Sequence, residues 1–148
     1  MKEGGSEFRS ERERGPMKID RLEVYQKYDG HCAYCGGPIS LKEMHVDHVI
    51  PKTRYHDKHD CLIVNGGKFT EYSLNDIRNL NPACGPCNRW KSAFLLEDFR
   101  KEIEEQVARL RKYSASYRMC ERYGLVTQQR IKVIFYCELI KAMRGEGE

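Results

Sequence analysis

Two Cys-x-x-Cys pairs constrain the fold of this 148-residue chain more than any other feature. The first pair is Cys32 and Cys35, and the second is Cys84 and Cys87. Four thiolates in two such pairs fit the tetrahedral coordination of zinc, and four-thiolate ligation makes the ion structural. The interval between the pairs exceeds the roughly 15 to 20 residues of an ordinary four-cysteine finger. We therefore expect zinc to clamp both ends of a module whose middle holds further structure.

A redox role is the alternative for a Cys-x-x-Cys pair, but two pairs without a βαβ pattern do not favour it. The seven cysteines are an odd number, and the N-terminus lacks the apolar core of a secretory signal. Both observations favour zinc over disulfides and predict a cytoplasmic protein. No apolar run approaches the roughly 18 residues that span a bilayer, so we expect no membrane partner.

Between the pairs lies the stretch Met-His-Val-Asp-His-Val-Ile-Pro, which contains Asp47 and His48 side by side among apolar residues. A carboxylate can bind a hard divalent cation, and an imidazole can accept a proton near neutral pH. A structural Asp–His pair is the plainer alternative. Adjacent strand residues point to opposite faces, so His48 can join Asp47 in one site only where the strand bends or ends. His45 shares the face of Asp47 and is a weaker second candidate for a metal ligand or a phosphate contact.

Further motifs follow this stretch: Asn79-Leu80, and then Cys87-Asn88-Arg89-Trp90-Lys91 after the second pair. Together with Asp-His-x-x-Pro, they resemble the HNH endonucleases, whose fold is the ββα-metal motif. The resemblance covers about residues 17 to 91. The interval from His48 to Asn79 is longer than the family's minimal hairpin, which indicates an insertion at residues 52 to 73.

The resemblance implies a role for each matching residue. Asp47 would bind the catalytic cation, and His48 would be the general base that activates water. Asn79 would brace the loop between the strands, and Asn88 would complete the metal site. The zinc ligands would be Cys32, Cys35, Cys84 and Cys87.

By the same resemblance, the chain would hydrolyse phosphodiester bonds in DNA with Mg²⁺ or Mn²⁺, as a small enzyme of phage or mobile-element type. Phage or mobile-element proteins are then possible partners. The net charge of +4 permits nucleic acid as a partner without requiring it. The basic residues nearest the motifs are candidate DNA contacts: Lys52, Arg54, Arg89 and Lys91. The alternatives are a catalytically silent zinc-stabilised nucleic-acid-binding module and a structural zinc-ribbon interaction domain.

The predicted fold is α+β, with a ββα-metal core clamped by the four-cysteine site. We expect a disordered arm at residues 1–16, the nuclease domain at 17–94 and a helical extension at 95–148. Apolar spacing predicts a helix over residues 17–28 and a long amphipathic helix from residue 95 to 110. A strand is expected over 40–50, a hairpin around Asn65-Gly66-Gly67, and a helical piece over 117–123. Residues 131–139 fit both periods, and their β-branched and aromatic content favours a strand.

Overall fold

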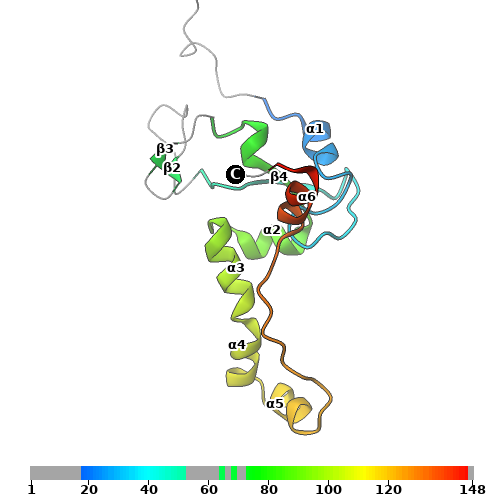
Figure 1. Cartoon of the computed structure of the whole chain (residues 1–148), viewed down its shortest axis with the longest axis vertical. Coiled ribbons are helices and arrows are strands. Elements are labelled where there is room, and N and C mark those ends of the chain that lie inside the picture. Colours follow the sequence, from blue (N-terminus) through cyan, green and yellow to red (C-terminus); the bar gives the residue numbers. More distant parts are fainter. Residues whose placement is uncertain (1–17, 53–63, 66–67, 70–72, 147–148) are drawn as a thin grey trace, which may run out of the picture.

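The computed structural model describes residues 18–52, 64–65, 68–69 and 73–146, which form an α+β fold (Figure 1). The arm predicted at residues 1–16 and most of the insertion predicted at 52–73, Arg54 included, lie outside the described residues. Among the residues described, no helix is long and apolar enough to cross a membrane.

A two-stranded antiparallel sheet and the helix that follows it form the centre of the molecule. Strand β1 (His45–His48) pairs with β4 (Leu80–Ala83), so that Asp47 lies opposite Asn81. Helix α2 (Gly85–Lys91) begins directly after β4, because the Cys84 side chain accepts the Cys87 N–H and caps the helix. The chain thus runs from strand to strand to helix around the two cysteine pairs.

The strands differ from their predicted bounds. The strand predicted over residues 40–50 is limited to β1, because residues 41–43 form a turn. Strand β4 was not predicted, since it contains Pro82, which lacks an amide donor. A two-stranded sheet tolerates proline because each strand keeps one open edge, and the Pro82 carbonyl accepts the Ala33 N–H at 2.8 Å. The predicted hairpin is confirmed as β2 (Val64–Asn65) paired with β3 (Lys68–Phe69), in a separate sheet.

Helix α1 (Arg21–Gln26) is shorter than the predicted helix, because the Asp20 side chain caps it by accepting the Leu22 and Glu23 N–H groups. Its C-terminal neighbour Lys27 donates from Nζ to the carbonyls of Ile77 and Leu80, at 2.9 and 2.7 Å. Ile77 begins the short 3₁₀ helix η2 (Ile77–Asn79), which leads into β4. These bonds fasten α1 to the sheet.

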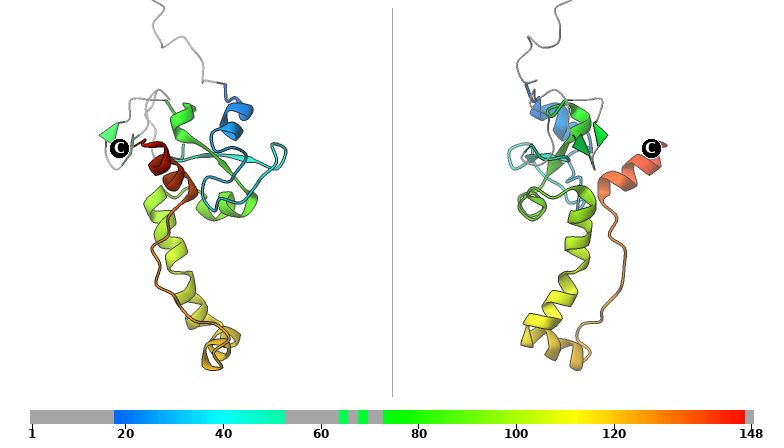
Figure 2. Two further views of the ribbon diagram at one scale, coloured as in Figure 1. Left: turned by 45° about the vertical axis from the view of Figure 1, so that its right-hand side comes forward. Right: turned by 90° about the vertical axis from the view of Figure 1, so that its left-hand side faces the viewer.

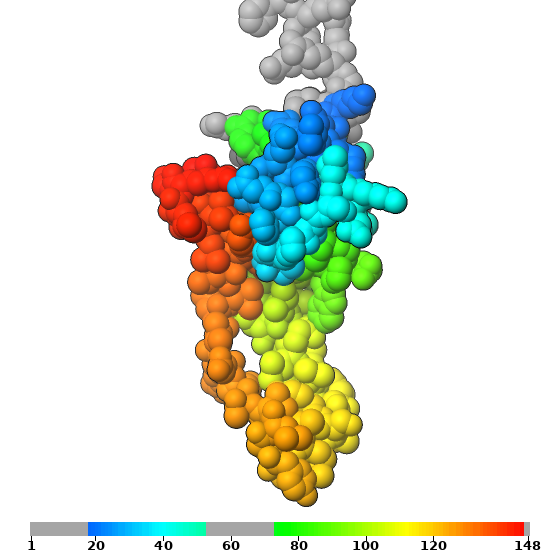
Figure 3. Space-filling model, turned by 90° about the vertical axis from the view of Figure 1, so that its right-hand side faces the viewer, coloured from blue at the N-terminus to red at the C-terminus, as the bar shows by residue number. Residues whose placement is uncertain are grey.

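The C-terminal third forms an arm that extends from this centre and then returns to it (Figures 1 and 2). The long helix predicted from residue 95 is divided at Glu105 into α3 (Leu96–Glu104) and α4 (Gln106–Tyr113). Helix α5 (Ala115–Arg122) confirms the predicted helical piece and lies at the far end of the molecule (Figure 3). Residues 124–135 run back beside α4 and α3 to α6 (Tyr136–Arg144).

The strand predicted over residues 131–139 is wrong. Residues 131–135 have no regular structure, and α6 begins at Tyr136. The Glu138 carboxylate accepts the Phe135 N–H at 2.8 Å, which starts the helix, and Gly145 ends it at a φ of 69°. The alternation of Phe135 and Cys137 reflects two side chains that enter the core, since both are buried.

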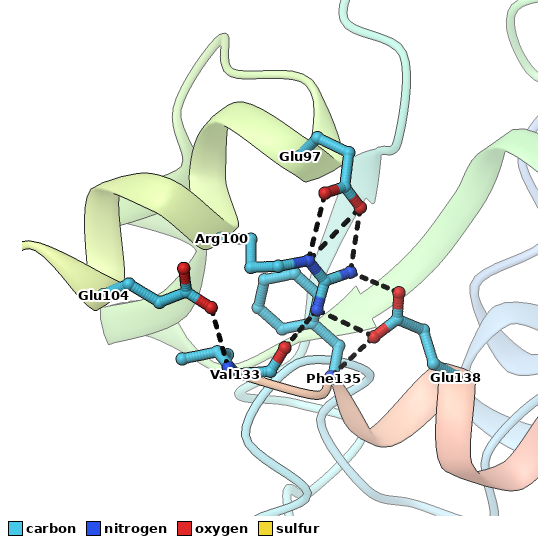
Figure 4. A network of polar contacts seen from close by, with 6 residues as sticks. All are labelled: Glu97, Arg100, Glu104, Val133, Phe135 and Glu138. Atoms are coloured by element: carbon cyan, nitrogen blue, oxygen red, sulfur yellow. Dashed lines mark hydrogen bonds and ion pairs between the residues drawn. The ribbon is translucent and has the colours of Figure 1, made fainter. Parts of the chain in front are cut away.

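The returning segment is held by Arg100 on α3 (Figure 4). The Arg100 guanidinium binds the Glu97 and Glu138 carboxylates and the Val133 carbonyl, and it lies 4.8 Å from the Phe135 ring centre. The Phe135 and Phe99 rings are stacked, with their centroids 5.2 Å apart. Each of them forms a T-shaped pair with the Tyr34 ring, at a centroid distance of 5.5 Å. The main core therefore joins the first cysteine pair to α3 and α6. The boundary predicted at residues 94 and 95 stays a prediction.

Candidate metal and catalytic site

Four cysteine sulfurs converge at one end of the central sheet. The Sγ atoms of Cys32, Cys35, Cys84 and Cys87 all lie within 4.8 Å of one another, and those of Cys35 and Cys84 are 3.9 Å apart. A tetrahedral zinc ion with Zn–S bonds of about 2.3 Å separates its sulfurs by about 3.8 Å. The spacing in the structure fits that geometry, so the four cysteines could hold a metal ion such as zinc.

Backbone amides surround these sulfurs. The N–H groups of Gly37, Cys84 and Cys87 donate to the sulfurs of Cys35, Cys32 and Cys84 at 3.3 to 3.5 Å. Gly36 makes the first turn possible with a φ of 73°, and its N–H donates to the Cys32 carbonyl at 2.9 Å. A hydrogen bond from the Cys87 thiol lowers the pKa of Cys32 well below the usual thiol range. The pKa values of Cys35 and Cys87 are raised instead, the first chiefly by burial and the second chiefly by the hydrogen bond to Cys32, so the arrangement favours negative charge on one sulfur, that of Cys32.

Asp47 lies on β1, where its side chain is almost completely buried. The Tyr34 hydroxyl donates to its Oδ2 atom, and Lys91 Nζ lies 3.0 Å from the same oxygen. Burial raises the pKa of Asp47 above its ordinary value, and the ion pair with Lys91 opposes that rise. Because Oδ2 already has two donors, Oδ1 is the oxygen left for another ligand.

Lys91, the last residue of α2, is fully buried. Its Nζ atom also donates to the His48 carbonyl at 2.9 Å, so one side chain fixes both residues of the Asp-His pair to the helix. The sequence prediction that Lys91 contacts DNA phosphate does not fit this burial. We therefore assign it to positioning of Asp47 and His48.

His48 is the last residue of β1 and has a different side-chain partner from Asp47. Its Nε2 atom lies 2.8 Å from Asn75 Oδ1. An amide oxygen only accepts hydrogen bonds, so Nε2 carries the proton and Nδ1 keeps its lone pair. This tautomer leaves one imidazole nitrogen able to accept a proton.

Asn79 is fully buried and braces the chain that follows His48. Its Oδ1 atom accepts the Ile50 N–H at 2.9 Å, and its Nδ2 atom donates to the carbonyls of Ile50 and Leu74 at 3.2 and 2.9 Å. In addition, its carbonyl accepts the Val49 N–H at 2.8 Å. The end of β1 is thereby tied to the segment that enters β4.

We expect Asn79→Ala to lower the free energy of unfolding by about 2–3 kcal/mol, because three buried backbone groups lose their partner. Urea titration of zinc-loaded protein measures this loss. Gln128→Ala, which removes an amide from an exposed position, is the matched control and should change stability by less than about 0.5 kcal/mol. An Asn79→Ala protein as stable as this control would contradict the bracing role.

The other predicted residues lie around α2. Asn88 is half-buried. It lies one helical turn before Lys91, so the two residues are neighbours on one face of α2. Arg89 is exposed, and a side chain at Gly85 would approach its guanidinium at 3.4 Å and His45 Nε2 at 3.7 Å. The basic groups of Arg89 and His45 therefore lie together over the first turn of α2. Lys52 is exposed after β1.

Sequence reasoning missed two partners in this site. Tyr34 occupies a spacer position inside the first Cys-x-x-Cys pair, and Asn75 belongs to a polar stretch without periodicity. Neither carries a local signal, because each acts only through contact with a residue far along the chain.

No family model matches the sequence, and no curated protein matches it. Among solved structures, the fold is similar to the crystal structure of the Type II-C Cas9 enzyme from Actinomyces naeslundii. The TM-score is 0.41 with 21% sequence identity, and the match covers 74% of this chain and 11% of that chain. A similarity of this size carries no conclusion about function, which must come from the chain's own site.

Proposed function

We propose that this chain is a metal-dependent endonuclease of the HNH type that hydrolyses phosphodiester bonds in DNA. The observation that carries the proposal is the joining of β1, β4 and α2 around Asp47 and His48. Lys91 of α2 contacts both residues, and Asn79 fixes the chain that follows them. A protein that only binds nucleic acid or another protein needs no such arrangement.

In this proposal His48 is the general base. The bond to Asn75 holds the imidazole ring, so Nδ1 of the neutral ring can take a proton from the attacking water. His48 is the last residue of β1 and pairs with Leu80, so the proposal requires the ring to reach the site of Asp47 from the end of the strand.

Asp47 and Asn88 would hold the catalytic cation. A carboxylate oxygen and an amide oxygen are hard donors that suit Mg²⁺ or Mn²⁺. When bound, such a cation stabilises the negative charge that develops at the phosphate during hydrolysis. Tyr34 and Lys91 would hold the Asp47 carboxylate in one orientation, with Oδ1 directed to the cation. The four cysteines would bind a separate, structural zinc ion.

Lys52 and Arg89 remain the candidate phosphate contacts near this site, since both side chains are exposed. Arg54 stays a prediction outside the described residues.

The second candidate is a catalytically silent zinc-stabilised module that binds nucleic acid. The buried ion pair between Asp47 and Lys91 favours it, because a carboxylate that is already paired competes poorly for a cation. Incubation of supercoiled plasmid DNA with the protein and Mg²⁺ or Mn²⁺ separates the two. An endonuclease converts the plasmid to nicked or linear DNA, whereas a silent module retards it on the gel without cutting.

A further inference from the structure

The distal arm consists of α4, α5 and the first part of the returning segment, residues 106–132. It extends away from β4, α2 and α6 in the ribbon views (Figures 1 and 2), and it forms the projecting end of the space-filling view (Figure 3). Neither α4 nor α5 contains a buried residue. The arm is fastened at its base, where Arg100 holds Val133 and Glu104 accepts the Val133 N–H at 2.9 Å (Figure 4). Helices α4 and α5 therefore contribute little to the core, and their surface is a candidate for a function other than stabilising the fold.

Charge is concentrated on this arm. Residues 106–132 contain seven basic residues and one acidic residue, a formal net charge of +6. The whole chain has a net charge of +4, so the remaining residues together carry −2. The basic residues of the arm therefore account for the net positive charge of the protein.

Several of these cations have no carboxylate partner. Arg109 pairs with Glu102 and Glu105, and Arg111 pairs with Glu121. Over the part of the chain that the structure describes, no ion pair joins a carboxylate to the following residues: Lys112, Arg118, Arg122 and Arg130. Arg118 donates to the carbonyls of Arg111 and Lys112, which leaves its charge uncompensated, and Arg122 lies one turn further on α5.

Exposed aromatic rings accompany these cations. Tyr113 and Tyr123 are 74% and 72% exposed, and they lie at the ends of α4 and α5. The Lys112 Nζ atom lies 5.0 Å from the centre of the Tyr113 ring, and cations beside exposed rings suit a polyanion that also offers flat bases. Interfaces with other proteins are also enriched in arginine and tyrosine, so it is the formal net charge of +6 that favours a polyanion as the partner of the arm.

We propose that the distal arm is a second nucleic-acid-binding surface, which contacts the phosphate backbone of DNA away from the candidate catalytic site. The inference rests on the proposed function for the identity of the substrate. Helices α3 and α4 span 18 residues, or about 27 Å at 1.5 Å per residue. This length corresponds to roughly eight nucleotides of a DNA strand at 3.4 Å each. The arm would then set the orientation of DNA and leave bond cleavage to Asp47 and His48.

The test compares two triple variants of the full-length, zinc-loaded protein by fluorescence anisotropy with a labelled 30-base-pair duplex. The arm variant is Lys112→Gln, Arg122→Gln and Arg130→Gln. The control removes the same charge from exposed lysines on the centre of the molecule: Lys18→Gln, Lys42→Gln and Lys141→Gln. Circular dichroism melts establish that both variants remain folded.

We expect the arm variant to bind DNA at least about tenfold more weakly at low salt, and the slope of log affinity against log salt to fall by about 0.9 for each lost contact. The control should change both quantities much less. Cleavage by the arm variant at saturating DNA should match the wild type, while the half-saturating DNA concentration rises. Equal losses in both variants, or an unchanged arm variant, would overturn the proposal. Competition by phosphatidylserine vesicles at the same affinity would also overturn it, in favour of a membrane surface.

These results distinguish the arm from the proposed function. A wild-type protein that never cuts DNA but loses affinity in the arm variant keeps the arm proposal and removes the nuclease. If the wild-type protein cuts DNA and the arm variant binds DNA normally, the nuclease proposal stands and the arm proposal is overturned.

Discussion

Replacement of His48 by alanine should lower the rate of DNA cleavage by roughly 10²- to 10⁴-fold, the usual contribution of a positioned general base. Zinc content and DNA affinity should stay close to those of the wild type, because the partner of the His48 side chain among the described residues is Asn75, not a cysteine of the cluster or a residue of the distal arm. Single-turnover cleavage of a labelled duplex, with enzyme in excess, measures the chemical step apart from binding.

Two matched variants separate loss of the base from loss of local structure. His48→Gln keeps a side-chain donor for Asn75 Oδ1 but has no basic nitrogen, so it should be as inactive as alanine. His45→Ala removes an exposed imidazole from the same strand and should have a much smaller effect. A His48→Ala enzyme that cuts at the wild-type rate contradicts the assignment. A strong loss in His45→Ala would move the base to the face of Asp47.

Replacement of Cys35 by serine should remove the metal and unfold the module that contains both cysteine pairs. Structural zinc contributes on the order of 10 kcal/mol to the folding of small zinc modules, more than a chain of this size has to spare. The two pairs are 49 residues apart from Cys35 to Cys84, and the sulfur cluster brings them together beside the short strands β1 and β4. Elemental analysis and thermal melting measure the loss directly.

Cys120→Ser is the matched control, because Cys120 lies on α5, outside the cluster. This variant should retain about one zinc ion per chain and melt within about 2 °C of the wild type. A Cys35→Ser protein that behaves like this control would show that the four sulfurs do not bind a stabilising metal.

The features predicted well from the sequence are those whose chemistry is local. A Cys-x-x-Cys pair closes its own turn, so the approach of Cys32 to Cys35 depends on few other residues. The meeting of this pair with Cys84 and Cys87 followed from the coordination number of zinc alone. The start of α2 at Gly85 is also a local feature, because Pro86 suits the first turn of a helix.

The features that were missed depend on tertiary contacts. Strand β4 contains Pro82 and exists because β1 and the first cysteine pair supply its partners. Residues 131–135 alternate like a strand, yet their conformation is set by Arg100 and by the stacking of Phe135 on Phe99. The positive charge of Lys91 led to its prediction as a DNA contact. Its ion pair with the buried Asp47 could not be read from the sequence, because the two residues are far apart along the chain.

The most direct measurement of the central claim is plasmid cleavage by zinc-loaded protein with the second metal withheld and then restored. The protein is dialysed so that it keeps one zinc ion per chain but holds no Mg²⁺ or Mn²⁺, and wild type, His48→Ala and Asp47→Ala are compared in parallel. We predict no cutting before addition, nicked or linear plasmid within minutes after addition of Mg²⁺ or Mn²⁺ to the wild type, and little product from either variant. Cutting that is independent of the added metal, or equal in all three proteins, would contradict a metal-dependent nuclease at Asp47 and His48.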